Sequence, residues 1–466
     1  MSEIYFPPFR REYKGGRFCE SGNDKINYFM LTHEPIIKVG ILENRTEVSG
    51  KFQGSFSIEG KKIEGEFFIK IFNEEIVLSD NVQKIFSGKE IICIPLNNES
   101  TFSLYDVVIG VNFHWERKET QIFQGNLKFI IANNNTIIVI NEISLEKYLA
   151  SVISSEMNAK APLELLKAHA ITSRSWLAAM LKQKEETSNI GISSQRNYET
   201  ENEIIRWYDR EDHPFFDVCA DDHCQRYQGI TKIISSSVQK AIDETWGKFL
   251  VSENHICDAR FSKCCGGISE AFENVWEFTS IPYLTSITDS PISYNLITTE
   301  EEVKQWILSN PVAYCNTQDK NILQQILPSF DRETKNFFRW KIEYEIEELS
   351  NLIKQKPGID FGIISNLIPI QRGPSGRIIK LKIEGSKKTV VVGKELEIRR
   401  WLSKTHLYSS AFIVEKHNNK FIFHGAGWGH GVGLCQIGAA VMATQNFPAE
   451  KILQHYFRTA KIQKLY

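Results

Sequence analysis

The sequence predicts an α+β fold, in which strands and helices occupy separate stretches of the chain and do not alternate regularly. Three observations carry this prediction. Residues 36–143 are rich in β-branched and aromatic side chains, helical periodicity begins only after them, and strand-like runs return near the C-terminus. With 42% hydrophobic and 24% charged side chains among 466 residues, the composition is that of a globular protein, which excludes the disordered, collagen-like and coiled-coil classes.

The domain organisation follows from length and from changes in composition. At about 150 residues per domain, the length allows two or three domains. The chain divides into an irregular N-terminal arm (1–35), a β-rich subdomain (36–143), the first part of a mixed core (144–298), a charged helical insertion (299–353) and the second part of the core with a glycine-rich motif (354–466). The arm mixes Pro, Gly and charged residues without periodicity, as irregular segments do.

The β-rich subdomain contains runs with the composition of strands, bounded by Gly, Asn or Asp residues. These runs are Ile36–Leu42, Ile63–Phe72 and Thr136–Ile140. The three asparagines at 133–135 predict a turn between Phe129–Ile131 and the last of these runs, because Asn favours turn conformations. We therefore expect this subdomain to consist mostly of strands.

Two helices are predicted directly after the strands. Apolar side chains recur at i, i+3, i+4, i+7 and i+8, which is the stripe of an amphipathic helix. They are Leu145, Tyr148, Leu149, Val152 and Ile153. A second helix is expected to follow Pro162, since proline suits the first helical position.

The remaining stretch alternates between loops, helices and strands. Residues 191–265 have the texture of loops, and 299–353 combine charge with helical patterning. Strand character returns in Arg377–Ile383 and Ser410–Val414, and a last helix is expected over Pro448–Phe457.

The charge balance limits the class of partner. Lys and Arg total 55 and Asp and Glu total 57, for a net charge of -2, which argues against nucleic acid or an anionic membrane as the main partner. No run approaches ~18 consecutive apolar residues, so no transmembrane segment is expected. The first residues lack the basic-then-apolar layout of a secretory signal peptide. We therefore expect either a chain that stays inside the cell or a mature form.

The nine cysteines indicate local chemistry and not a disulfide scaffold, because they are dilute and odd in number. Four of them form two tight groups, Cys219 with Cys224 and Cys264 with Cys265. The others are Cys19, Cys93, Cys257, Cys315 and Cys435.

Glu156 is the first candidate for chemistry. Continuing the stripe of the first helix by one step places this carboxylate on the face that should be buried. Burial disfavours the charged form and raises the pKa of a carboxyl group, as a general acid at neutral pH requires. In the alternative interpretation the helix ends here, and Glu156 faces solvent or pairs with Arg174.

A second candidate is a cluster of two histidines and two cysteines, the ligand types and number of a tetrahedral zinc site. Its members are His213, Cys219, His223 and Cys224. The spacing is not that of a zinc finger, and joint ligation by the last two requires a turn, for which Asp221–Asp222 is suited.

The alternative for this cluster is a reduced thiol pair with unrelated histidines. We favour a metal, because free Cys and His rarely cluster so closely without a shared ligand. Cys264 and Cys265 are an alternative source of ligands, or have no function at all.

The third candidate is the glycine-rich segment, where every second residue from Gly425 to Gly433 is glycine. It does not fit G-x-G-x-x-G, and no Lys-Ser/Thr follows, so a phosphate site is not expected. The alternation predicts an extended strip without side chains, against which another backbone or a sugar would lie. Trp428 would stack on a pyranose ring or belong to the core, and His430 would hold or polarise a substrate hydroxyl.

Several of these segments resemble the stage II sporulation protein D/LytB family, whose members are lytic transglycosylases of peptidoglycan and related amidase enhancers. The main matches are Leu145–Met157, Leu166–Trp176 and Gly427–Ala439. Further matches are Cys224–Gly229, Phe261–Gly267, Ser375–Ile378, Ile398–Leu402 and Ile452–Phe457. They follow the order of the family, and the resemblance extends from about Ile36 to the C-terminus.

This resemblance implies roles for individual residues and makes 144–298 and 354–466 the catalytic core. Glu156 stands at the position of the catalytic acid/base. The residues that line or shape the cleft are Arg174, Gly266, Gly267, His430 and Gln436. Some sporulation members hold zinc through two His and two Cys, which the cluster at 213–224 resembles. Such a zinc would be structural, because four protein ligands leave no open position for water.

The chain also departs from the family pattern. His169 stands in place of the usual Gln, and Trp176 in place of a common Tyr. Cys264 and Cys265 replace small or hydroxyl residues, and Cys435 replaces a Ser. The insertion at 299–353 is longer than expected. The missing export signal is the largest mismatch, because peptidoglycan lies outside the cytoplasm; the substrate implies the cell envelope or periplasm.

The expected reaction needs one carboxylate. Ordinary glycosidases pair two, but in a lytic transglycosylase the muramyl C6 hydroxyl attacks its own anomeric carbon at high effective concentration. No second carboxylate stands out in the matched segments, so Glu156 would protonate the glycosidic oxygen of a MurNAc–GlcNAc strand and then accept the hydroxyl proton. Two alternatives stay open: a glycan-binding enhancer of a cell-wall amidase (an N-acetylmuramoyl-L-alanine amidase), and a zinc hydrolase.

Overall fold

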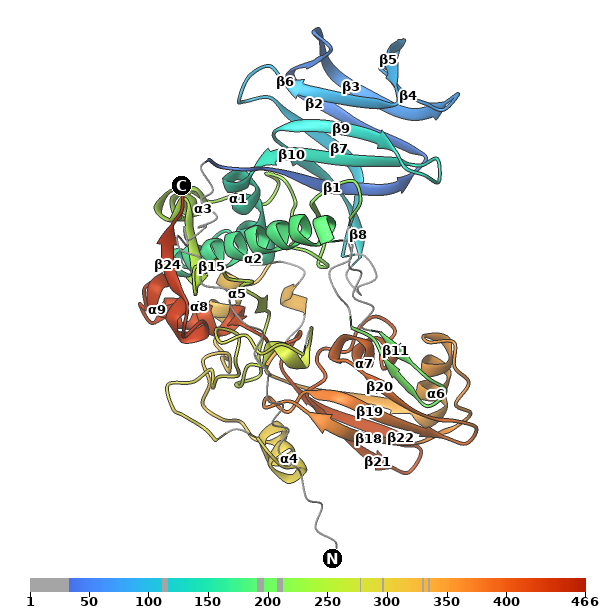
Figure 1. Cartoon of the computed structure of the whole chain (residues 1–466), viewed down its shortest axis with the longest axis vertical. Helices are drawn as coiled ribbons and strands as arrows, with labels where there is room; N and C mark the ends of the chain where they lie inside the picture. The colour runs from blue at the N-terminus through green and yellow to red at the C-terminus, as the bar shows by residue number, and fades with distance from the viewer. Residues whose placement is uncertain are drawn as a thin grey trace, which may run out of the picture.

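The computed structural model describes residues 33–110, 116–190, 197–207, 213–276, 278–295, 297–328, 331–333 and 336–466. Most of the expected N-terminal arm, including Cys19, lies outside the described residues. Among the described residues, ten strands precede the first helix, and helices and further strands follow, which confirms the predicted α+β class. Figure 1 shows a β-rich lobe, a helical centre and a second lobe that mixes strands and helices.

The N-terminal lobe consists of strands β1 to β10. Their bounds are β1 (Ile36–Arg45), β2 (Glu47–Ile58), β3 (Lys61–Phe72), β4 (Glu75–Ser79), β5 (Lys84–Gly88), β6 (Glu90–Pro95), β7 (Thr101–Ile109), β8 (Arg117–Phe123), β9 (Asn126–Ile131) and β10 (Ile137–Ser144). With β13, they pair in the order β13–β1–β10–β9–β6–β2–β3–β4–β5, and β7 pairs with β2 and β8. Phe52 packs against Phe56 and Phe67, with ring centroids 4.7 and 4.6 Å away, so the lobe has an aromatic core.

Two connections join this lobe to the helical centre. β10 continues directly into α1 (Leu145–Glu156), so the register of the sheet fixes where this helix begins. β13 (Val218–Cys219) lies parallel to β1, with Val39 opposite Val218 and Gly40 opposite Cys219. One residue of the predicted metal cluster is therefore attached to the edge of the N-terminal sheet.

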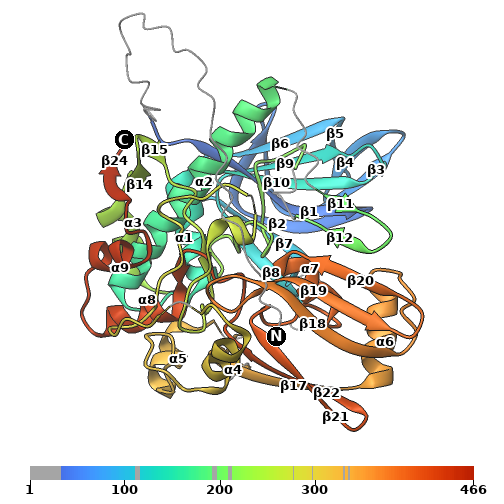
Figure 2. The same cartoon turned by 60° about the horizontal axis from the view of Figure 1, so that its bottom comes forward.

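The helical centre is built around α2 (Leu163–Ile190), which contacts α1, α3, α8 and α9 (Figures 1 and 2). These later helices are α3 (Ser236–Thr245), α8 (Gln436–Thr444) and α9 (Ala449–Tyr456). The short strands are β14 (Lys248–Ser252), β15 (His255–Ile256), β16 (Phe261–Ser262), β23 (Leu434–Cys435) and β24 (Lys461–Lys464). The helices predicted from 145, after Pro162 and over 448–457 are confirmed, and their apolar faces continue the core of the N-terminal lobe.

The second lobe has its own apolar core. One sheet has the order β11 (Tyr198–Glu199), β12 (Glu203–Ile205), β20 (Thr389–Gly393), β19 (Ile378–Gly385) and β18 (Ile364–Arg372). Another has the order β17 (Arg339–Glu345), β22 (Lys420–Ala426) and β21 (Phe412–His417), and helices α6 (Ile346–Gln355) and α7 (Glu395–Trp401) also belong to this lobe. In Figure 2 this lobe lies beside the helical centre.

The stretch 299–353 is helical only in part. It contains α4 (Glu300–Leu308), α5 (Lys320–Ile326) and most of α6, but Arg339–Glu345 is strand β17 and not a helix. β17 pairs antiparallel with β22 along its whole length, from Arg339 opposite Ala426 to Glu345 opposite Lys420. The strand arises from pairing with a distant segment, which a local charge pattern does not record.

The glycine-rich segment is not the extended strip that its alternation predicted. Gly427, Gly429 and Gly431 have φ angles of 76°, 90° and 78°, in the left-handed region that favours glycine. A Cβ atom at Gly431 would lie 2.3 Å from the guanidinium carbon of the buried Arg377. The glycines therefore let the backbone turn around a side chain of the same chain, and do not form an open strip for a sugar.

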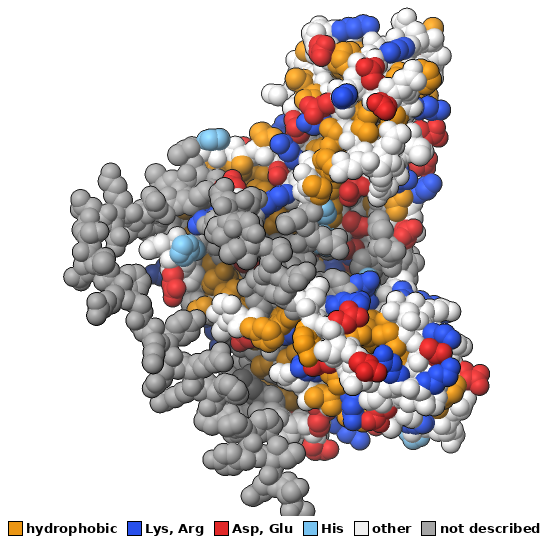
Figure 3. Space-filling view, turned by 45° about the vertical axis from the view of Figure 1, so that its right-hand side comes forward, with side chains coloured by type: hydrophobic (Ala, Val, Ile, Leu, Met, Phe, Trp, Pro, Cys, Tyr) orange, Lys and Arg blue, Asp and Glu red, His pale blue; other side chains and the backbone are white. Residues whose placement is uncertain are grey.

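The described surface has mixed charge. On the face shown in Figure 3, acidic and basic side chains are interspersed over both lobes. Among the helices that the structure describes, none combines the length and the apolar character needed to cross a membrane.

Candidate functional site

Glu156 lies at the C-terminal end of α1, and its side chain is buried with 7% exposure. The apolar stripe of this helix packs into the core, with Leu149, Val152 and Ile153 fully buried. The predicted burial of Glu156 is therefore confirmed, because the next step of the stripe continues on the buried face. The alternative pairing with Arg174 is wrong, since Arg174 binds Glu146.

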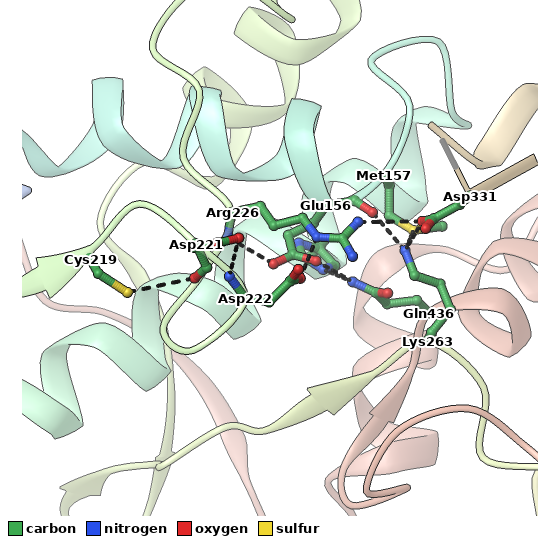
Figure 4. Close-up of polar contacts among 10 residues, drawn as sticks. Glu156, Met157, Cys219, Asp221, Asp222, Arg226, Lys263, Asp331 and Gln436 are labelled. Atoms are coloured by element: carbon green, nitrogen blue, oxygen red, sulfur yellow. Dashed lines mark hydrogen bonds and ion pairs between the residues drawn. The ribbon is translucent and has the colours of Figure 1, made fainter. Parts of the chain in front are cut away.

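Backbone and amide groups hold the Glu156 carboxylate (Figure 4). The backbone N–H of Arg226 donates to Oε1 at 3.0 Å, and the amide nitrogen of Gln436 donates to Oε2 at 3.4 Å. The same amide lies 3.0 Å from Nε2 of the fully buried His169. Burial lowers the pKa of His169 to about 4, so the ring is neutral, and Nε2 accepts from the amide when Nδ1–H donates to Ser173 Oγ at 3.3 Å.

A charged network surrounds this carboxylate. The Arg226 guanidinium contacts Asp222 and lies 3.5 Å from Asp331, which Lys263 binds at 2.8 Å. Lys263 Nζ also donates to the backbone carbonyl of Glu156 at 2.9 Å. Three carboxylates share two cations in this network, so a single proton makes it neutral.

The pKa of the Asp222 carboxyl group is raised well above its usual value. Burial, and to a lesser extent the charge of Glu156, raise the pKa of Asp222 to about 7, although the Arg226 guanidinium acts in the opposite direction. By contrast, Lys263 and Arg226 hold the pKa of Asp331 below its usual value despite its burial. The two neighbours of Glu156 thus respond differently to the same cations.

Five residues of this network were not assigned to the site from sequence: His169, Asp222, Arg226, Lys263 and Asp331. Two of them had a signal, because Arg226 and Lys263 fall inside the short segments that resemble the family. His169 was noted only as a departure from that pattern, and Asp222 only as a turn residue. Asp331 lies in the presumed insertion, where no sequence signal pointed to it.

The predicted Cys/His cluster comes together. The donor atoms of its four residues all lie within 4.8 Å of one another; they are His213, Cys219, His223 and Cys224. Cys224 Sγ lies 3.5 Å from His213 Nε2 and 3.4 Å from His223 Nδ1, and Cys219 Sγ lies 3.9 Å from His223 Nδ1. Zinc–sulfur and zinc–nitrogen bonds in a tetrahedron place S and N about 3.6 Å apart, so these separations fit a shared metal.

The electrostatics of this cluster also favour a cation. Hydrogen bonds from Cys224, and then from His213 and His223, lower the pKa of Cys219 to about 2, although burial acts in the opposite direction. A thiolate is the form of cysteine that binds a metal. The turn that closes the cluster, with Cys224 N–H donating to the Asp221 carbonyl at 3.0 Å, carries Asp222 toward the Glu156 network.

The other residues predicted from the resemblance lie apart from Glu156. Arg174 is fully buried and forms a two-point ion pair with Glu146, at 2.9 and 2.5 Å. Gly266 and Gly267 adopt φ angles of 82° and 103°. A Cβ atom at Gly266 would lie 2.9 Å from the backbone nitrogen of Gly427, so its role is to allow close approach of two backbones.

Trp428 and His430 also contact other groups. The Trp428 ring stacks on Tyr408 with centroids 4.5 Å apart. His430 lies edge-on to Trp276 at 4.6 Å, and its Nδ1 accepts from Val432 N–H at 3.0 Å. Burial, and then nearby guanidinium groups, hold the pKa of His430 well below its usual range, so this ring is neutral. Of the predicted cleft residues, Gln436 is the one that the structure brings to the Glu156 carboxylate.

This geometry defines a class of protein: an α+β protein with a buried carboxylate in a charged network at a helix end, beside a Cys/His group able to hold a metal. The assignment to a family comes from comparison with known proteins. Residues 133–251 match the profile of the family described as stage II sporulation protein, and residues 270–433 match a domain of unknown function. The first match contains Glu156, Arg226 and the whole Cys/His cluster.

Three relatives extend this comparison. An uncharacterised protein of Brachyspira hyodysenteriae is 24% identical over 439 residues, which are 93% of this chain and 94% of that protein. Stage II sporulation protein D of Bacillus amyloliquefaciens is 23% identical over 331 residues, 70% of this chain and 76% of that protein. The amidase enhancer of Bacillus subtilis is 24% identical over 236 residues, 48% of this chain and 32% of that protein. These similarities support the predicted resemblance to the stage II sporulation protein D/LytB family.

Proposed function

We propose that this protein is a lytic transglycosylase that cleaves the MurNAc–GlcNAc strands of peptidoglycan. The observation that carries the proposal is the environment of Glu156, which is buried, hydrogen-bonded on both carboxylate oxygens and adjacent to two cations. A carboxyl group held this way has a fixed orientation and little water around it, as an acid/base catalyst requires.

The proposed reaction uses Glu156 twice. The protonated carboxyl gives its proton to the glycosidic oxygen as the bond from the muramyl anomeric carbon to that oxygen breaks. The muramyl C6 hydroxyl then attacks the anomeric carbon and returns its proton to Glu156, which leaves a 1,6-anhydro end and a free hydroxyl on the leaving sugar. The enzyme ends in its starting state, and no water is consumed.

The neighbours support this role by holding the helix end and the carboxylate. Arg226 and Lys263 bridge to Asp331, and Lys263 also binds the last carbonyl of α1. Both cations are engaged by carboxylates, so neither is left as an isolated buried charge. Asp222 is likewise bound by Arg226, which makes it a partner of that cation and not a candidate nucleophile.

The Cys/His cluster is proposed to hold a structural zinc ion through His213, Cys219, His223 and Cys224. The distances fit a tetrahedral ion, and four protein ligands leave no open position for water. Zinc would fix the turn at 219–224, which carries Asp222 and leads into Arg226. No chemical step requires the ion.

A second candidate function is supported by similarity to the Bacillus subtilis amidase enhancer. In that case the same site binds glycan strands without cutting them and stimulates a cell-wall amidase. The two functions differ in whether Glu156 must exchange a proton.

The Glu156→Gln variant separates these functions, because glutamine keeps the shape and hydrogen bonds but cannot act as an acid. We expect purified wild-type protein to release 1,6-anhydromuramyl products from glycan strands without stem peptides, detected by mass spectrometry. The variant should lose these products by at least ~100-fold while it still cosediments with insoluble glycan. Equal product formation by both proteins would remove Glu156 as the acid/base. If neither protein forms products but both bind glycan and raise the rate of an added amidase, the enhancer function replaces this proposal.

A further inference from the structure

A second group of potential ligands lies in the interior, away from the Cys/His cluster. Its donor atoms all lie within 4.8 Å of one another and belong to Cys265, Asp289, Cys315 and Cys435. All four residues are buried, with at most 2% exposure. We refer to them as the inner cluster, and to His213, Cys219, His223 and Cys224 as the outer cluster.

The inner cluster joins segments that are far apart in the chain. Relative to Cys265, its partners Asp289, Cys315 and Cys435 lie 24, 50 and 170 residues away. Cys265 follows β16, Cys315 lies between α4 and α5, and Cys435 precedes α8. The Asp289 carboxylate contacts Tyr456 and His455 through Oδ1 and presents Oδ2 to the Cys265 thiol, so distant segments bring three thiols and one carboxylate oxygen to the same place.

The distances within the inner cluster fit a tetrahedral ion. Cys265 Sγ lies 3.6 Å from Cys315 Sγ and 3.3 Å from Asp289 Oδ2. Zinc with sulfur and oxygen ligands gives S–S edges of about 3.8 Å and S–O edges of about 3.6 Å. A disulfide requires about 2.05 Å between sulfurs, so in this arrangement Cys265 and Cys315 are two separate ligand atoms.

Groups around the cluster orient its donors. The Cys265 N–H donates to Cys435 Sγ at 3.2 Å, and the Gly267 N–H donates to Cys265 Sγ at 3.4 Å. The Tyr456 hydroxyl donates to Asp289 Oδ1 at 2.7 Å, which leaves Oδ2 toward the sulfurs. N–H groups that point at sulfur and a hydroxyl that holds a carboxylate are the usual outer support of a metal site.

The nearby charge fits an anionic cluster. Three thiolates and one carboxylate around a divalent ion carry an excess of two negative charges. Arg339 interacts electrostatically with the thiols of Cys265 and Cys315, and its guanidinium donates to backbone carbonyls, including those of Gly266 and Trp306. Within the described part of the chain, no carboxylate forms an ion pair with Arg339. The charge of Arg339 is therefore available to offset part of the negative charge of a metal-bound cluster.

A small cavity borders the cluster at Cys315. Its volume is about 60 Å³, and Cys315 and Arg339 form part of its wall. The rest of the lining includes amide and hydroxyl side chains from Asn310, Asn316, Thr317, Gln318 and Asn336. The cluster therefore borders a polar space, large enough for water, at one of its four proposed ligands.

We propose that Cys265, Asp289, Cys315 and Cys435 bind a second structural zinc ion. Binding releases three thiol protons, and the ion stays four-coordinate without water. The position of this ion in the fold connects it to the candidate active site. Cys435 precedes Gln436, and β16 and β23 pair in parallel with Ser262 opposite Cys435 and Lys263 next in the chain. The ion therefore links the two segments that supply Gln436 and Lys263 to Glu156. This inference does not depend on the proposed reaction.

The first test measures the number of zinc ions bound per full-length chain. The protein is dialysed exhaustively, and its zinc content is then determined by elemental mass spectrometry. We expect two zinc ions per wild-type chain, one in each cluster. Cys219→Ser should remove the outer ion and Cys315→Ser the inner ion, so each variant should retain one. Cys93→Ser is the matched control, because Cys93 is also a fully buried thiol but belongs to neither cluster. A Cys219→Ser protein with no zinc would overturn the proposal.

The second test identifies the ligands even where a variant folds poorly. Co²⁺ added to metal-free Cys219→Ser protein should give the thiolate-to-cobalt absorption of a tetrahedral site. Asp289→Ala should weaken this signal and Cys264→Ser should leave it unchanged, because Cys264 lies beside the cluster but outside the proposed ligands. Loss of the signal in Cys264→Ser with retention in Asp289→Ala would refute the assigned donor set. Recovery of Cys265 and Cys315 as a disulfide from freshly isolated wild-type protein would refute the metal itself.

Discussion

The outer and inner clusters contain similar donor atoms but are assembled in different ways. The first and last residues of the outer cluster, His213 and Cys224, are separated by 11 positions in sequence, and the cluster includes the exposed His223. The inner cluster is fully buried and reaches from Cys265 to Cys435, 170 residues away. A short-range cluster requires only a turn, whereas a long-range cluster requires that the whole fold has formed. The first stabilises a loop, and the second stabilises the arrangement of several segments.

The largest expected effect is the loss in free energy of unfolding when either cluster loses its zinc ion. Linking points about 15 residues apart stabilises a fold by about 3 kcal/mol through loop closure, and points about 100 residues apart by about 5 kcal/mol. Removal of zinc from the inner cluster by Cys315→Ser should therefore lower the free energy of unfolding by roughly 5 kcal/mol, against roughly 3 kcal/mol for Cys219→Ser. Urea denaturation of both variants and of Cys93→Ser measures this difference. A greater loss in Cys219→Ser would reverse the comparison.

The next largest effect is on the pH dependence of the free energy of unfolding. It distinguishes a buried histidine from an exposed one. The folded protein holds the pKa of His169 at about 4, below the ordinary value of 6.5, because the ring is buried. Between these values the unfolded chain binds a proton that the folded chain does not, so stability falls as pH falls through this range. Over the full interval this costs on the order of 3 kcal/mol.

His169→Gln should remove that loss. We expect the free energy of unfolding to fall less between pH 7 and pH 4.5 in the variant than in the wild type, by about 2 to 3 kcal/mol. Denaturation curves at both pH values provide the measurement, and His417→Gln, at an exposed position outside both clusters, serves as the comparison. An identical pH dependence in His169→Gln and wild type would show that this ring is not buried as a neutral group.

The smallest expected effect is at Trp428, whose backbone pairs with Cys264 next to the inner cluster. The ring stacks on Tyr408 and packs against Phe337, as a core side chain does. Trp428→Phe keeps an aromatic ring there, so we expect the affinity for glycan strands to change by less than about threefold. Binding isotherms with soluble glycan strands test this. A loss of tenfold or more would make Trp428 a sugar platform and not a structural neighbour of the inner cluster.

The proposed ions also differ in how fast they should exchange. His223 of the outer cluster is exposed, whereas all four inner ligands are buried. A chelator should therefore remove the outer ion at least about tenfold faster than the inner ion, because release of the inner ion requires local opening of the core. Time-resolved colorimetric detection of released zinc, in wild type and in Cys219→Ser, separates the two phases. If Cys219→Ser lost the slow phase, the assignment of fast and slow ions would be wrong.

The sequence determined the parts of this protein that depend on local spacing. The helical stripe from Leu145 placed Glu156 on a buried face, because a period of 3.6 residues fixes side-chain direction within one helix. The outer cluster was predictable for a similar reason, since a turn is enough to bring together ligands within 11 residues. The α+β class followed from the separation of strand-like and helical patterns.

Only the tertiary structure decided what depends on distant partners. Strand β17 forms through pairing with β22, and the alternating glycines accommodate Arg377 in place of an extended strip. Asp331 reaches the network of Glu156 from a segment that sequence alone marked as an insertion. The inner cluster is the clearest case, because its four donors meet only after their segments have packed. Local sequence patterns do not predict such long-range contacts, because these contacts form only when the whole core packs.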